Sequence, residues 1–259
     1  MGLRATFLGT GTSTGVPVIA CSCDVCRSSD GRNRRLRSSL LVESPEVVLW
    51  IDTTPDFRQQ ALRQGVERID AVLFTHAHAD HIFGLDDLRV FNFRQRAAIP
   101  CHGSVATLEA LRRTFAYIFE PGCEGGGKPQ IELVPVTGGF RLGDLEVQPV
   151  PVFHGSLEVL GFRFTAGSAS LAYVTDCSRI PVTSEDLLTG VDTLILGALR
   201  YRSHPTHFTV EEAIAAAQRL AARRTFLTHL SHEVDHAAPR IELPPEVAFA
   251  HDGLVLEVD

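Results

Sequence analysis

Residues 75–81 read Thr-His-Ala-His-Ala-Asp-His and directly follow the apolar run Ala-Val-Leu-Phe. The run predicts a short buried strand, so three imidazoles and one carboxylate stand where a strand ends. Core packing does not account for them, because each buried imidazole would need its own polar partner. His76 and His78 can converge from an extended loop, whereas Asp80 and His81 begin the next helix and point to a neighbouring position. The motif therefore predicts metal binding, at two adjoining positions rather than one.

Three further polar residues follow predicted strands in the same way. They are His154, after residues 147–153; Asp176, after residues 171–175; and His229, after residues 226–228. Open α/β sheets bind ligands beyond the carboxyl ends of their strands, which is where these side chains stand. Each residue alone is better explained as a turn residue or a cap. Together with residues 76–81, they predict a dinuclear metal site.

Composition limits the class of protein. The chain has 259 residues, of which 44% are hydrophobic, enough to bury one substantial core. It carries 24 Lys and Arg against 31 Asp and Glu, a net charge of −7, so we expect no broad basic face and no nucleic-acid partner. No apolar run reaches the length of a membrane span, and the first residues lack a signal-peptide pattern. We therefore expect a cytoplasmic protein without a membrane partner.

Short apolar runs alternate with amphipathic ones. The predicted strands are 4–8, 40–42, 47–51, 71–75, 145–153, 160–165, 170–175, 193–196, 225–228 and 253–258. The predicted helices are 55–64, 80–89, 105–115, 184–188 and 210–223, the last with a capping box of Thr209 and Glu212. Residues 9–39 and 119–130 are rich in Gly, Pro and polar residues, which predicts long loops, and the second is a candidate lid.

Three cysteines crowd into six residues, in the pattern Cys21-x-Cys23-x-x-Cys26. Cys21 and Cys23 are too close for a comfortable disulfide, which favours a reducing compartment. Three thiolates can instead hold a structural zinc that lacks one ligand, and His232, three residues past His229, is the natural fourth. The alternative is a set of buried free cysteines.

The run His76-x-His78-x-Asp80-His81, followed by His154, Asp176 and His229, resembles the metallo-β-lactamase superfamily. The resemblance implies an α/β (α+β) fold: a single domain over residues 1–259, built as a four-layer αββα sandwich of two mixed sheets flanked by helices. The cysteines would lie in a zinc-binding loop insertion near residues 18–37. By the family pattern one metal is held by His76, His78 and His154, the other by Asp80, His81 and His229, and Asp176 bridges. Asp52 matches the carboxylate that supports the family's metal site.

Two further motifs narrow the resemblance. The dinuclear set with a Cys3His zinc is similar to the phosphoribosyl 1,2-cyclic phosphate phosphodiesterases of the carbon–phosphorus lyase pathway. The opening Gly9-Thr10-Gly11 and Gly15-Val16-Pro17 also resembles them and the tRNA 3′-processing nucleases. This chain contains His204-Pro205-Thr206-His207, and in the phosphodiesterases a histidine at the corresponding place acts as general acid. By its position we favour His207 as the general acid, with His204 as the alternative. Asp80 is the other candidate catalytic residue.

The expected activity follows from these residues. Two metals about 3.5–4 Å apart would share a water, lower its pKa and generate the hydroxide that attacks a small cyclic or linear phosphodiester. The expected cofactors are two divalent ions, Mn²⁺ or Zn²⁺ with iron a further candidate, and one structural Zn²⁺. A homodimer is compatible with the sequence. The alternatives are a tRNA 3′-processing nuclease, for which we find no basic patch, another hydrolase of this fold acting on an ester or thioester, and a non-catalytic metal-binding protein.

Overall fold

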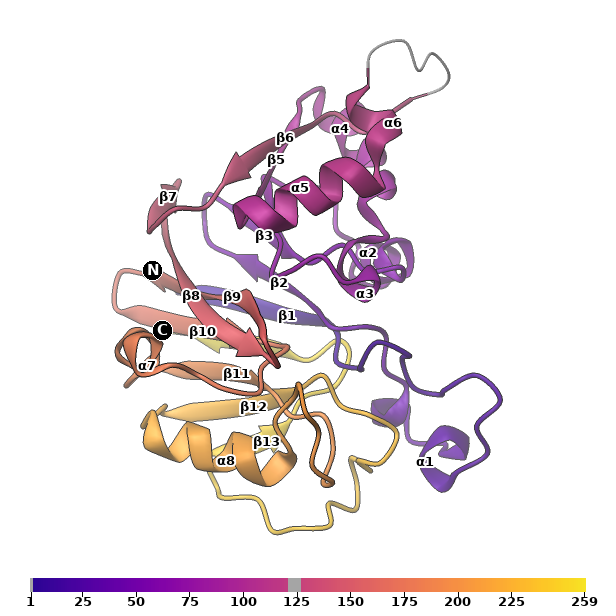
Figure 1. Ribbon diagram of the computed structural model, residues 1–259, viewed down its shortest axis with the longest axis vertical. Helices are drawn as coiled ribbons and strands as arrows, with labels where there is room; N and C mark the ends of the chain where they lie inside the picture. Colours follow the sequence, from indigo (N-terminus) through magenta and orange to yellow (C-terminus); the bar gives the residue numbers. More distant parts are fainter. Residues whose placement is uncertain (1, 121–126) are drawn as a thin grey trace.

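The computed structural model describes residues 2–120 and 127–259. Two seven-stranded sheets pack face to face, and helices cover the outer face of each (Figure 1). This is the four-layer αββα sandwich of two mixed sheets that the sequence predicts.

The strands of the first sheet come from residues 3–135, except for β14 at the C-terminal end. Its strands, in spatial order, are β14 (Val255–Val258), β1 (Leu3–Gly9), β2 (Ser39–Glu43), β3 (Val48–Ile51), β4 (Ala71–Leu73), β5 (Ile99–Gly103) and β6 (Ile131–Pro135). Pairing is antiparallel from β14 to β3 and parallel from β3 to β6. The parallel part brings the carboxyl ends of β3 and β4 to one edge.

The second sheet comes from the C-terminal half. In spatial order its strands are β13 (Val247–Phe249), β12 (Arg224–Thr228), β11 (Thr193–Gly197), β10 (Ala169–Val174), β9 (Leu157–Ala166), β8 (Leu145–His154) and β7 (Phe140–Leu142). Strands β10 to β13 are parallel, and β8 runs the same way as β10 because both are antiparallel to β9. The carboxyl ends of β8, β10 and β12 therefore share one edge.

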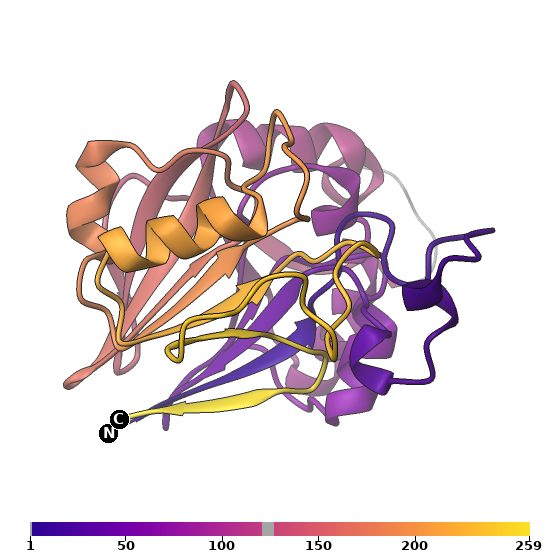
Figure 2. The ribbon, with the colours of Figure 1, turned by 90° about the horizontal axis from the view of Figure 1, so that it is seen from below.

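Short helices complete the layers. They are α1 (Asp24–Arg27), α2 (Phe57–Gln64), α3 (Ala79–Ile82), α4 (Arg89–Gln95), α5 (Val105–Thr114), α6 (Ala116–Phe119), α7 (Val182–Leu188) and α8 (Val210–Arg219), with 3₁₀ turns η1 (Gly31–Asn33) and η2 (Leu85–Leu88). Buried side chains of α2 to α5 pack on the first sheet, and those of α7 and α8 on the second. The segment with α1 extends away from both sheets, on the side opposite the chain ends (Figure 2).

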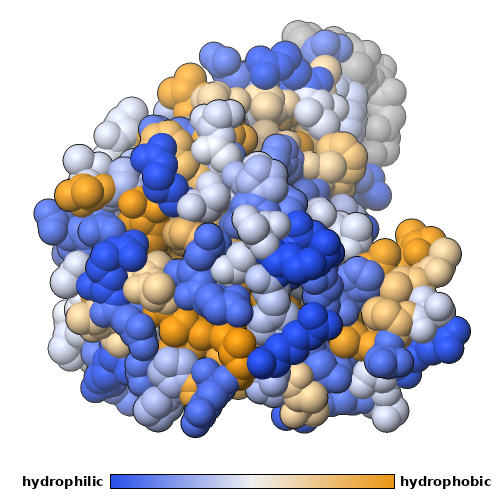
Figure 3. All heavy atoms as spheres, turned by 60° about the horizontal axis from the view of Figure 1, so that its bottom comes forward, coloured by the Kyte–Doolittle hydropathy of each residue, from blue (hydrophilic) through white to orange (hydrophobic). Residues whose placement is uncertain are grey.

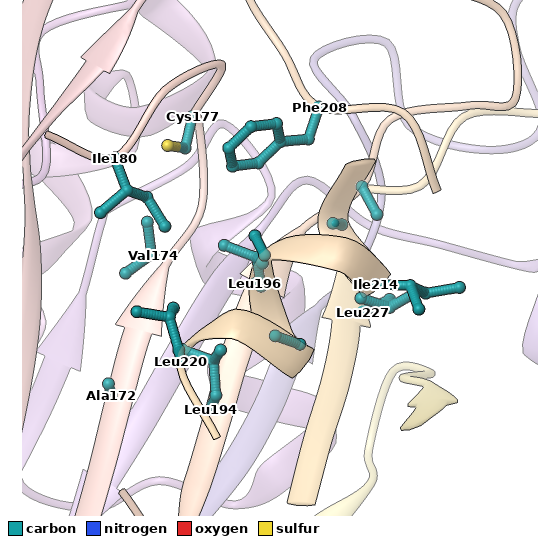
Figure 4. Close-up of a cluster of buried hydrophobic side chains, with 14 of the residues drawn as sticks. Ala172, Val174, Cys177, Ile180, Leu194, Leu196, Phe208, Ile214, Leu220 and Leu227 are labelled. Atoms are coloured by element: carbon teal, nitrogen blue, oxygen red, sulfur yellow. The ribbon is translucent and has the colours of Figure 1, made fainter. Parts of the chain in front are cut away.

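Apolar side chains fill all three spaces between the layers. Phe7, Phe162 and Phe164 lie between the sheets, each fully buried. On the outer face of the second sheet, strand residues such as Leu194 and Leu227 face α8 (Figure 4). Helices α2, α5 and α8 therefore bury one face each, as their amphipathic sequences predict.

One predicted helix is wrong. Residues 80–89 form α3, then the turn η2, and a separate helix α4 that begins where the predicted one ends. Gly84 causes the break: its N–H donates to Thr53 O at 2.8 Å, and an added Cβ would lie 2.2 Å from Thr54 O. Only a glycine permits this approach.

Other boundaries also differ. The last helix ends at Arg219 rather than Arg223, because Ala221 has a left-handed φ of 52° and the chain turns directly into β12. Strands β5, β6, β7 and β13 were not predicted; they are short, and the first two contain a proline. Part of the candidate lid, residues 121–126, lies outside the described residues.

Among the described residues, no helix is long and apolar enough to span a membrane. The face drawn in Figure 3 is largely hydrophilic, with hydrophobic residues in small separate groups. Large side chains that are exposed in the structure include Ile19, Leu62, Val90, Phe93 and Val182.

The cap of α8 provides a test of local stability. Thr209 Oγ1 accepts from Glu212 N at 3.1 Å, and Glu212 Oε2 accepts from Thr209 N at 2.8 Å. We expect Thr209→Ala to lower the free energy of unfolding by about 1 kcal/mol, because Glu212 N loses its acceptor. Urea unfolding measures this, with the exposed Thr183→Ala in α7 as control. Equal midpoints for the two variants would contradict the prediction.

Candidate metal centre

The predicted ligands converge because five strands end at one edge. Residue 52 follows β3, residues 76–81 follow β4, His154 ends β8, Asp176 follows β10 and His229 follows β12. Parallel strands of both sheets deliver these side chains to the same place.

The ligand atoms form two adjoining groups. One atom each from His76, His78 and His154 lie within 4.8 Å of one another. The same limit holds for a second group, Asp80, His81, Asp176 and His229. The structure thus brings together all seven residues predicted from the sequence.

Asp176 stands between the two groups. Its Oδ1 lies 3.2 Å from His229 Nε2 and 3.5 Å from His81 Nε2, and its Oδ2 lies 3.9 Å from His76 Nε2. A carboxylate that reaches both groups has the position of a bridging ligand.

Hydrogen bonds fix which nitrogen faces the centre. His81 Nδ1 donates to Asp52 Oδ2 at 2.7 Å, which leaves Nε2 free to bind a metal. Thr75 Oγ1 donates to the same carboxylate oxygen at 2.7 Å and accepts from His76 Nδ1 at 3.0 Å. His154 Nδ1 donates to Thr206 O at 2.7 Å. Three imidazoles are therefore held with Nε2 toward the site.

Several titratable side chains of the two ligand groups have shifted pKa values. Burial, with the neighbouring His81, holds the pKa of His76 well below its usual range, so this ring is neutral and able to bind a metal. Burial opposes the charged form of His81, yet Asp176 and Asp52 raise its pKa well above the usual value. Asp176 is fully buried, but the imidazoles around it lower its pKa well below the usual value. Anionic carboxylates among imidazoles favour a cation between them.

Two features of the site fit a bound cation. His76 Nε2 lies 3.0 Å from His78 Nδ1, so ring nitrogens of two candidate ligands meet at one point. Within the described chain, neither ring nitrogen of the buried His229 makes a hydrogen bond. A buried imidazole without a partner is costly, and a metal would use its lone pair. The residues fit the two-metal site.

The two candidate acids are placed differently. His207 Nε2 lies 3.9 Å from Asp176 Oδ2, and its ligand atom lies within 4.8 Å of those of His154 and Asp176. His204 is one ring further out, 5.1 Å from His207 between centroids, and its Nδ1 accepts from Thr206 N at 3.3 Å. Position beside the site therefore favours His207.

The cysteine motif also assembles. His232 Nδ1 lies 3.2, 3.5 and 3.6 Å from the sulfurs of Cys21, Cys23 and Cys26. Three sulfurs and one nitrogen around one point are the donor set of a structural zinc. The alternative of a set of buried free cysteines fits less well, because Cys21 and Cys23 are only partly buried and all three sulfurs lie near His232 Nδ1.

A family model for the beta-lactamase superfamily domain matches residues 48–230. The chain belongs to the metallo-β-lactamase superfamily. It is a metal-dependent hydrolase of that superfamily by fold, with His and Asp groups suited to binding divalent metals. A solved structure of a diphosphatase from the PhnP family is 44% identical to it with a TM-score of 0.91, covering 99% of this chain and 97% of that one.

Other similarities are partial or more remote. An octanoyltransferase of Porphyromonas gingivalis is 38% identical over 99% of this chain, but the chain spans only 52% of that protein. Human tRNase Z, short form, has a TM-score of 0.73 over 99% of both chains at 21% identity, which shows the shared fold.

Several residues that shape the site have no sequence signal. Thr206 acts through its carbonyl oxygen, which any residue offers. Gly197 allows β11 to approach β10, since an added Cβ would lie 1.8 Å from Thr175 O, next to Asp176. The side chain of Cys177 is buried beside Ile180 and Phe208 (Figure 4), which accounts for it as a packing residue.

Asp52 offers a test of ligand orientation. We expect Asp52→Asn to weaken metal binding by about 10–100-fold, because His81 and Thr75 lose a charged acceptor. Titration of the metal-free protein with Zn²⁺ or Mn²⁺ measures it, with the exposed Asp186→Asn as control. Unchanged affinity in Asp52→Asn would show that orientation of His81 does not depend on this carboxylate.

Metal content tests both groups at once. Purified protein should contain about three ions per chain. Cys23→Ser should lose about one ion and keep the dinuclear pair, since the thiolate set is separate from it. His76→Ala should instead reduce the dinuclear content. Elemental analysis showing one ion or none in the unaltered protein would refute the two-site assignment.

Proposed function

We propose that the protein is a dinuclear-metal phosphodiesterase acting on a small cyclic or linear phosphodiester. One observation carries the proposal: seven predicted ligands meet in two adjoining groups, with Asp176 between them and His207 beside them. The full-length similarity to a PhnP-family diphosphatase supports chemistry at phosphorus.

The residues divide into a floor and an open face. His76, His81, His154, Asp176 and His229 are buried and form the floor. His78 is exposed, and the side chains of Asp80 and His207 are 15% and 12% exposed, so substrate approaches from their side. We assign His76, His78 and His154 to one metal, and Asp80, His81 and His229 to the other, bridged by Asp176.

Two divalent ions at such a site lower the pKa of water and neutralise charge on a phosphate. Asp52 and Thr75 orient the imidazoles that hold them. In this proposal Asp80 contributes to catalysis as the partly exposed carboxylate of the second group. Mn²⁺, Zn²⁺ and iron are the candidate ions, with Zn²⁺ proposed for Cys21, Cys23, Cys26 and His232.

His207 is proposed to protonate the leaving oxygen. Burial, with the nearby His229, lowers the pKa of His207 to about 3, so the ring is neutral in the free protein. A bound anionic phosphate beside it would raise this pKa and so favour the protonated form. Leaving groups that are strong bases need this proton most.

The proposed substrate is small, such as phosphoribosyl 1,2-cyclic phosphate. The net charge of −7 disfavours a long nucleic-acid partner. The similarity to a PhnP-family diphosphatase favours phosphorus chemistry over the ester or thioester alternative. We also propose a single domain over residues 1–259, a cytoplasmic location and a homodimer as the form to test.

A second candidate is cleavage of a diphosphate bond, which the similar PhnP-family structure favours by its described activity. The same metal centre serves both reactions. They differ in the leaving group: a phosphate departs with little need of a proton, whereas an alkoxide needs one. The role of His207 therefore distinguishes them.

The leaving-group test uses His207→Ala. For a 2′,3′-cyclic nucleotide we expect a fall in kcat of about 10²-fold or more, because the departing alkoxide lacks its proton. For bis-p-nitrophenyl phosphate, whose nitrophenolate leaves unaided, the fall should be slight. His76→Ala should abolish both activities. Equal losses in His207→Ala would refute the acid role, and cleavage of a diphosphate alone would favour the second candidate.

A further inference from the structure

The loop that carries the candidate acid is tied to the segment that carries two candidate metal ligands. We call residues 200–207 the histidine loop and residues 229–234 the anchor segment. The histidine loop lies between β11 and α8, and the anchor segment follows β12. His207 belongs to the first, while His229 and His232 belong to the second.

Glu233 of the anchor segment holds two arginines of the histidine loop. Arg202 Nε donates to Glu233 Oε2 at 3.0 Å, with a further bond from Nη2, and Arg200 Nη1 lies 3.8 Å from Glu233 Oε1. The side chains of Glu233 and Arg200 are 18% and 23% exposed, whereas that of Arg202 is 69% exposed. The contact of Glu233 with Arg200 is therefore better shielded from solvent than its hydrogen bonds with Arg202.

The guanidinium of Arg200 also binds backbone carbonyls of the histidine loop. Its Nε donates to Arg202 O at 3.1 Å and its Nη2 to Ser203 O at 2.9 Å. The guanidinium thereby shapes the turn that leads to His204. At the other end of the loop, Thr206 O accepts from His154 Nδ1 at 2.7 Å.

The anchor segment is fixed independently of the loop. Arg35 is fully buried and donates to Ser231 O at 2.9 Å and to Val234 O at 2.8 Å. Backbone bonds join Leu230 N to Thr10 O and Ser231 N to Leu199 O. Glu233 thus stands on a rigid support and holds the more exposed histidine loop.

We propose that Glu233 is a positioning residue: through Arg200 and Arg202 it fixes the histidine loop and sets where His207 lies beside Asp176. This inference rests on the proposed function of His207. Glu233 belongs to none of the three candidate ligand groups, although it directly follows His232. Its loss moves the acid more than the dinuclear ligands, because His154 stays at the end of β8 even where its bond to Thr206 O is loosened. Reactions that need a proton are therefore slowed most.

The test compares Glu233→Ala with Glu185→Ala. Glu185 is a matched control, since it pairs with Arg219 at 2.8 Å and is 26% exposed on α7. We expect Glu233→Ala to lower kcat for a 2′,3′-cyclic nucleotide by about 10-fold or more, and for bis-p-nitrophenyl phosphate by less than about 3-fold. Glu233→Gln, which keeps an acceptor for Arg202, should recover part of the loss. Equal losses on both substrates, or loss of bound metal, would overturn the proposal.

Hydrogen exchange gives a readout that does not depend on catalysis. Amides of residues 200–207 should exchange faster in Glu233→Ala than in the unaltered protein and in Glu185→Ala, because the loop loses its support. Unchanged exchange would overturn the positioning role. If the unaltered protein cleaves neither diester, the proposed function fails, and faster exchange in Glu233→Ala still supports Glu233 as the residue that holds this loop.

Discussion

The candidate metal centre depends on one buried carboxylate. Asp52 is fully buried, and burial raises its pKa, yet it accepts from His81 Nδ1, Thr75 N and Thr75 Oγ1. Through Thr75 it also reaches His76, so a single side chain orients one ligand of each group. Its backbone has a left-handed φ of 61°, a conformation that persists only where surrounding contacts impose it.

The second sheet supplies the other half of the centre. His154, Asp176 and His229 stand on strands whose relative positions are set by the apolar layer between the sheets. His229 also has a left-handed φ, of 58°, at the end of β12. Ligands from two sheets meet correctly only if the sheets do not slide, so packing far from the metals controls their geometry.

The candidate ligands can be predicted from the sequence because their pattern is visible over short stretches. Residues 76–81 place four of them in one run, and His154, Asp176 and His229 each occupy the position at the end of a strand. What the sequence does not reveal depends on distant contacts. Gly84 ends a helix because Thr54 lies against it. The side chain of Cys177 packs in a hydrophobic cluster. Glu233 contacts arginines that lie about thirty residues earlier in the sequence. Short strands such as β7 and β13 exist because neighbours pair with them, which propensity alone does not show.

The pairing of the outermost strands of the first sheet has a consequence for architecture. Leu3 pairs with Val258, at the opposite end of β1 from Thr10, which contacts Leu230 near the centre. Figure 2 shows the two chain ends together, away from the α1 segment. A second polypeptide joined at either end would start at the end of β1 that lies away from the candidate metal centre. Covalent fusion is thus geometrically compatible with substrate access, in line with a relative about twice as long as this chain.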